Sequence, residues 1–112
     1  MGGGITCASV LKQGSELSTS NFVDIATLAM PIKYVVAYCL MPNYNNFLAV
    51  YYADVENDTL VNTYRDSSSG GFEIDISSGL SNYFQFPNNG KTVQFKAPNQ
   101  YWLNKLRFVI SA

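Results

Sequence analysis

Two neighbouring segments of this chain, 33–41 (KYVVAYCLM) and 47–53 (FLAVYYA), are apolar or aromatic at nearly every position. Side chains of a β-strand alternate between the two sides of its sheet. In a small antiparallel protein, one of those sides normally meets water and is polar. Here both sides of a strand would be apolar. One side can form the core, and the other requires a cover such as a loop, a second subunit, a larger partner or a ligand.

The pattern alone leaves open which side is the core. Tyr34, Val36 and Tyr38 point one way, and their neighbours in the same segment point the other way. Either set could pack against a neighbouring subunit in a closed homo-oligomer. The candidates for this subunit interface are the tyrosines of the two segments, Tyr34, Tyr38, Tyr51 and Tyr52.

Length and composition indicate one folded domain. The chain has 112 residues, of which 47% are hydrophobic and only 13% charged, the reverse of a disordered chain. We expect a flexible glycine arm at 1–4 and a single domain at 5–112. The net charge is −1 and the cations are scattered, which argues against binding to nucleic acid. The sequence contains no run of about 18 apolar residues, so we expect no membrane-spanning helix. The N-terminal residues do not resemble a signal peptide.

Strand and turn signals alternate regularly along the chain. Nine alternating or apolar segments are the candidates for about eight short strands: 5–11, 21–30, 33–41, 47–53, 60–65, 72–77, 83–86, 91–97 and 106–111. The segment 21–30 also has apolar residues at helical spacing, so a helix is the alternative to the strand there. The Asn-Gly pair within 87–90 predicts a tight hairpin turn. The segment 100–105 could form a bend that places Trp102 against the core. This pattern is typical of an all-β protein, a small antiparallel β-sandwich with jelly-roll-like topology.

The residues offer little for catalysis. The chain has no histidine, which removes the commonest general base and metal ligand. Acidic side chains at Asp54, Glu56 and Asp58 could gather around Ca²⁺, but a solvated turn explains them more simply. Glu73 and Asp75 are better explained as cross-strand charge partners than as a glycosidase pair. We therefore predict no enzyme activity, no catalytic residue, no metal and no cofactor.

The two cysteines, Cys7 and Cys39, match no metal or redox motif. Both lie in apolar segments, where buried free thiols are common. We predict two free thiols, which suits assembly in a reducing cytoplasm.

Aromatic residues beside amides could bind a ligand. Flat rings cover the C–H faces of sugars while amides bond to hydroxyl groups. The residues with this mixture are Tyr44, Asn45, Tyr101 and Trp102. They are the candidate contacts for a ligand or receptor, with core packing as the competing explanation for Trp102.

The C-terminal third of the chain carries a resemblance to a known family. A strand, the Pro-Asn-Asn-Gly turn, KTVQFKAP and NQYWLNKLRFVISA together resemble the C-terminal β-sandwich heads of phage tail fibres and related virion appendage proteins. The segment KYVVAYCLMPNYNNFLAVYYAD is similar in style to their central hairpins. The resemblance implies a homotrimer located in the virion and assembled in the host cytoplasm. It also implies contacts with other virion proteins or a cell-surface glycan receptor.

Two functions follow as expectations. The first is a non-enzymatic structural or attachment protein of a bacteriophage virion, acting through oligomerisation and surface contacts. The alternative is a lectin-like carbohydrate-binding β-sandwich, in which exposed rings would stack on sugars.

Overall fold

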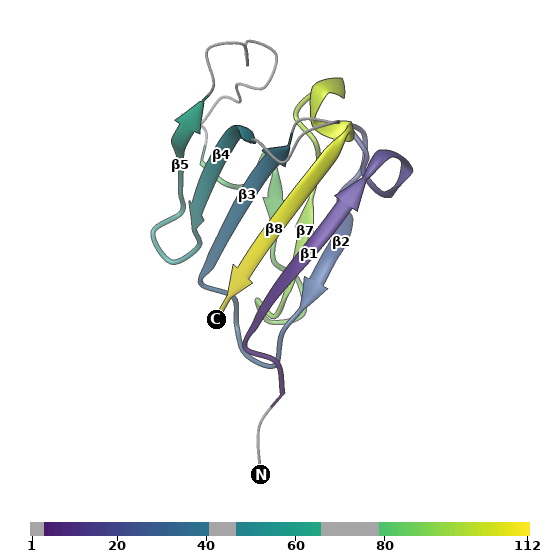
Figure 1. Ribbon diagram of the computed structural model, residues 1–112. Helices are drawn as coiled ribbons and strands as arrows, with labels where there is room; N and C mark the ends of the chain where they lie inside the picture. Colours follow the sequence, from purple (N-terminus) through teal and green to yellow (C-terminus); the bar gives the residue numbers. More distant parts are fainter. Residues whose placement is uncertain (1–3, 41–46, 66–78) are drawn as a thin grey trace.

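The computed structural model describes residues 4–40, 47–65 and 79–112, and these form two antiparallel sheets lying face to face (Figure 1). The front sheet in Figure 1, here called the five-stranded sheet, has the order β1 (Cys7–Gln13), β8 (Lys105–Ser111), β3 (Tyr34–Leu40), β4 (Phe47–Asp54), β5 (Thr59–Arg65). The three-stranded sheet behind it has the order β2 (Val23–Thr27), β7 (Thr92–Phe95), β6 (Phe84–Gln85). The described residues also include two short 3-10 helices, η1 (Gly14–Glu16) and η3 (Gln100–Leu103).

This architecture confirms the predicted all-β sandwich. β1 pairs with β8 and β2 with β7, a nested pairing of the jelly-roll kind, whereas β3, β4 and β5 follow one another within a single sheet. No helix in the described ranges is long and apolar enough to cross a membrane.

The core lies between the two sheets and is centred on aromatic rings. Phe95 of β7 lies 5.1 Å from the ring of Phe108 in β8, 5.2 Å from Phe84 in β6 and 6.3 Å from Trp102 in η3, measured between ring centroids. Around these rings, alternate residues of the five-stranded sheet are fully buried. They are Val35, Ala37 and Cys39 of β3, Ala49 and Ala53 of β4, and Leu106 and Ile110 of β8.

The ambiguous segment 21–30 contains a strand, as predicted. Residues Val23–Thr27 pair with β7, and the register shifts between Asp24 and Ala26. Side chains reinforce the pairing, because the hydroxyl oxygens of Thr27 and Thr92 lie 2.8 Å apart and Gln94 Nε2 donates to Asp24 Oδ1 at 2.8 Å. Cross-strand pairing therefore prevailed over the helical spacing of the apolar residues.

The first strand lies further along the chain than 5–11, at Cys7–Gln13, because each of its residues pairs with one of β8. The turn before β7 agrees with its sequence signal. Asn88, Asn89 and Gly90 have φ angles of 57°, 57° and 83°. Asparagine and glycine tolerate this left-handed region better than other residues do. The predicted loop at 42–46 and the predicted strand at 72–77 lie outside the described residues.

Both cysteines are free, as predicted, but only Cys39 is buried; Cys7 is exposed on β1. Burial raises the pKa of the Cys39 thiol from 9.0 to about 12. Between pH 9 and about pH 12, the Cys39 thiol is deprotonated in the unfolded chain but remains protonated in the folded chain. The contribution of Cys39 to stability is therefore complete below pH 9 and falls as the pH rises towards 12.

We expect a thiol reagent at pH 8 to modify Cys7 quickly and Cys39 only after unfolding, because the reactive species is the thiolate and Cys39 stays protonated and enclosed. Titration with an aromatic disulfide reagent, with and without denaturant, measures this. The variant Cys7→Ser should show no fast-reacting thiol in the native state. A fast reaction in that variant would contradict the placement of Cys39.

Candidate association surface

The five-stranded sheet is largely apolar on the side that faces away from the core. This surface, called the outer face, consists of the residues of the five-stranded sheet that point away from the three-stranded sheet. At its centre Val36 of β3 lies between Val109 of β8 and Tyr52 of β4. Tyr38, two residues along β3, lies between Arg107 and Val50. Strand pairing therefore gathers apolar side chains from distant parts of the chain on one face.

The outer face leaves large hydrophobic side chains open to water. Among the described residues, seven large hydrophobics are exposed, and five of them are on this face, with 36% to 47% of each side chain accessible: Leu11, Tyr34, Val61, Tyr64 and Val109. Contiguous apolar patches of this kind are uncommon on monomeric proteins and mark interaction sites.

Two tyrosines stack on this face. The rings of Tyr34 and Tyr52 lie 5.7 Å apart between centroids, with an angle of 25° between their planes. Desolvation raises the pKa of the Tyr52 hydroxyl, and the neighbouring Tyr34 hydroxyl and Asp54 carboxylate raise it further. The hydroxyl of Tyr52 therefore stays neutral at physiological pH.

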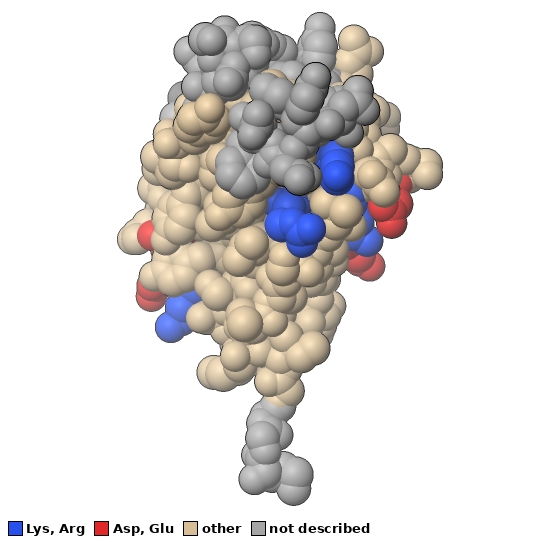
Figure 2. Space-filling model, in the orientation of Figure 1, with Lys and Arg blue, Asp and Glu red and all other residues tan. Residues whose placement is uncertain are grey.

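Charged groups are sparse on the outer face. Figure 2 shows this face towards the reader, with a broad area free of charged side chains across its middle and lower parts. Arg107 lies on the face and donates from Nη1 to Ser9 Oγ at 2.9 Å. Asp54 lies near the opposite end of the sheet and accepts from the backbone and side-chain amides of Asn57 at 3.2 and 2.8 Å.

The predicted interface residues divide between the two faces of the sheet. Tyr34, Tyr38 and Tyr52 lie on the outer face, where their register places them. The assignment of Tyr51 to an interface is wrong. Its side chain is 2% exposed and packs in the core, with its ring 5.5 Å from that of Trp102. Tyr51 pairs with Ala37, an inward residue, so it points to the opposite side from Tyr52.

The candidate ligand contacts have less structural support. Trp102 is fully buried, so it cannot serve as a stacking platform for a sugar in this conformation. The structure does not describe Tyr44 and Asn45, nor the side chain of Tyr101. The expected bend at 100–105 does place Trp102 against the core, as η3.

Sequence reasoning missed part of the outer face. Val61 and Tyr64 of β5 belong to it through their pairing with Tyr52 and Val50. Both are apolar positions in the segment LVNTY, but a bulge around Thr63 breaks their alternation, and Asn62 Nδ2 bridges it to the carbonyl oxygens of Val50 and Tyr64 at 3.1 and 2.8 Å. Only the register shows that the two residues share a face.

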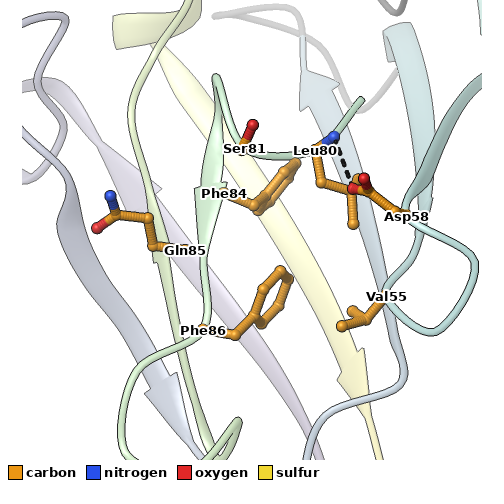
Figure 3. A pocket seen from close by; sticks show the side chains of 7 residues that line it. All are labelled: Val55, Asp58, Leu80, Ser81, Phe84, Gln85 and Phe86. Carbon is orange, nitrogen blue, oxygen red and sulfur yellow. Dashed lines mark hydrogen bonds between the residues drawn. The ribbon is translucent and has the colours of Figure 1, made fainter. Parts of the chain in front are cut away.

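A second feature is an open hollow of about 320 Å³ between the β4–β5 turn and the chain around β6 (Figure 3). The rings of Phe84 and Phe86 stack 6.3 Å apart and extend from the β6 side towards Val55. At its rim, the backbone amide of Leu80 donates to Asp58 Oδ1 at 3.3 Å. This bond holds the turn to the chain before β6, so Asp58 has a structural partner here.

The acidic residues Asp54, Glu56 and Asp58 lie in or beside the turn between β4 and β5, within the described ranges. No group of three or more His, Cys, Asp or Glu side chains that could hold a metal ion occurs among those residues. Asp54 bonds to Asn57 and Asp58 bonds to Leu80, which agrees with the turn that the sequence favoured over a calcium site. Glu73 and Asp75 lie outside the described residues.

The fold and its surfaces place the protein in a class: a small two-sheet antiparallel sandwich with an apolar outer sheet face. Comparisons with protein-family models, with curated proteins and with solved structures found no match.

Proposed function

We propose that this protein is a non-enzymatic structural protein that works by self-association through the outer face. The observation that carries the proposal is the exposure of five large hydrophobic side chains on that one face. Exposing these apolar side chains to water has a free-energy cost, because apolar surface is hydrated unfavourably. Covering the face with another protein surface removes this cost.

The free energy available is of the right size. Fully burying a valine or a similar apolar side chain contributes about 1.5–3 kcal/mol, so completing the burial of several part-exposed ones contributes several kcal/mol. Association loses translational and rotational freedom and orders side chains, at a cost of about 4–15 kcal/mol. Valine and tyrosine limit that cost, because they have few rotamers to lose.

The proposed setting is a virion, as a component of a tail fibre or other appendage. This part rests on the resemblance of the C-terminal third to appendage heads. The turn at 88–90 is exposed at two of its three residues and is available for contacts with another virion protein or a host receptor. The carbohydrate-binding alternative has less support, because the single tryptophan is buried in the core.

The substitution Val36→Glu tests association. It places a carboxylate at the centre of the outer face, where a partner would desolvate it, so we expect the dissociation constant of the oligomer to rise at least ~100-fold. Native mass spectrometry and light scattering across a concentration series measure the effect. Circular dichroism should show an unchanged β-sheet spectrum, since Val36 does not face the core.

The matched control is Ser20→Glu, which adds the same charge at an exposed position outside both sheets. It should leave the oligomer intact. A wild-type protein that stays monomeric at high micromolar concentration would overturn the proposed function.

A further inference from the structure

Three rows that run across the strands make up most of the outer face, and a further row beyond Leu11 and Arg107 begins with Gln13 and Lys105. The middle row takes one residue from each strand of the five-stranded sheet: Ser9, Val109, Val36, Tyr52 and Val61. Four of these five side chains are apolar or aromatic, and none is charged. The centre of the face is therefore a continuous uncharged band across the sheet.

The rows on either side carry opposite charges. On one side the only charged residue is Arg107, in the row Leu11, Arg107, Tyr38, Val50 and Tyr64. On the other side the only charged residue is Asp54, in the row Cys7, Ser111, Tyr34, Asp54 and Thr59. The face thus runs from a cationic row through an apolar row to an acidic row.

We propose that a second copy of this chain covers the outer face, related to the first by a two-fold axis that runs along the middle row. This inference rests on the proposed function and gives it a geometry. A two-fold axis makes each contact self-complementary, so each middle-row residue lies over the middle row of the other copy. The row with Arg107 in each copy then faces the row with Asp54 in the other, residue by residue along the same strand. Tyr34 of one copy faces Tyr38 of the second, Arg107 faces Ser111, and Asp54 faces Val50.

Shape and size agree with this arrangement. Both copies have the same strand twist, and an axis at right angles to the strands lets the two sheets follow each other's curvature. Five strands ~4.8 Å apart, with seven residues spaced ~3.4 Å, make a face of roughly 24 by 24 Å. The flat area of such a face is roughly 580 Å², below the ~800 Å² that each partner buries in a standard interface but above the roughly 500 Å² per partner of the smallest biological interfaces.

Charge pairs at Tyr34 and Tyr38 test the axis. In the variants Tyr34→Lys with Tyr38→Glu, and Tyr34→Glu with Tyr38→Lys, opposite charges would meet across the proposed interface. The matched controls carry two lysines or two glutamates at the same positions, so like charges would meet. We expect the dissociation constants of the opposite-charge variants to be at least ~10-fold lower than those of the like-charge variants.

A cross-linking experiment is independent of the effect of these charges on folding. The variant Val36→Cys in a Cys7→Ser background keeps a small side chain on the axis. Facing sheets lie ~10 Å apart, so a short bis-maleimide should join two copies through residue 36 in high yield. In the same background, Ser20→Cys should not cross-link, since it lies outside the sheets.

The outcomes separate the geometry from the function. A mass of two copies, an advantage for the opposite-charge variants and cross-linking at residue 36 support the two-fold dimer. Equal dissociation constants for all four charge variants, or a mass of three copies, overturn it. If either of these results is found but Val36→Glu still dissociates the oligomer, the protein associates through the outer face with a different symmetry. A monomeric wild type removes both proposals.

Discussion

The substitution Val35→Glu is expected to unfold the protein, although the same change one residue later is expected to leave it folded. Val35 is completely buried and belongs to the hydrophobic core between the two sheets. A carboxylate there would lose its hydration without gaining a cation. Leaving a charge buried and unpaired costs about 3–5 kcal/mol, a large part of the 5–15 kcal/mol that stabilises a typical domain.

The comparison with Val36→Glu isolates the effect of side-chain direction. Both substitutions place the same residue in the same strand, so strand propensity and net charge change equally. We expect urea denaturation of Val35→Glu to start from a largely unfolded baseline, while Val36→Glu retains a cooperative transition. Similar midpoints for both variants would mean that the core is on the other side of β3.

The second large effect is expected for Trp102→Ala, with a loss of about 3–5 kcal/mol in the free energy of unfolding. Trp102 is fully buried, with its ring 5.5 Å from that of Tyr51 and 6.3 Å from that of Phe95. Removing the indole leaves a large cavity beneath the five-stranded sheet, and the surrounding rings can fill it only in part. Urea denaturation followed by circular dichroism measures the lower midpoint at an unchanged slope.

Trp102→Phe is the matched control, because it keeps an aromatic ring and should cost clearly less than Trp102→Ala. The wild-type protein offers a further check, since its single tryptophan should fluoresce at short wavelength when folded and shift to long wavelength on unfolding. A loss below about 1 kcal/mol in Trp102→Ala would contradict its place in the core.

Several elements follow directly from local sequence. The alternation in 91–97 and 106–111 marks strands whose inward residues, such as Phe95 and Phe108, are buried in the structure. The Asn-Asn-Gly turn adopts the positive φ angles that its residues tolerate. These features depend on neighbouring residues alone, and so a periodic pattern is enough to predict them.

Other features depend on partners that are distant in the chain. Segment 21–30 satisfies both helical and extended spacing, and pairing with β7 decides between them. Tyr51 and Tyr52 look equivalent in the sequence, yet one packs against Trp102 and the other stacks on Tyr34. Alternation alone places these adjacent tyrosines on opposite faces. Only the pairing of Tyr51 with Ala37, an inward residue, shows which of the two faces the core.

The amino-acid sequence by itself determined that β3 and β4 would have two apolar faces, because that property is written in consecutive residues. Only the tertiary structure decided which face became the core. The three-stranded sheet brings Val93, Phe95 and Phe84 against the face that carries small side chains, Ala37, Ala49 and Ala53. Large rings fit over small residues at native packing density, so most of the bulky tyrosines of this hairpin remained on the outer face.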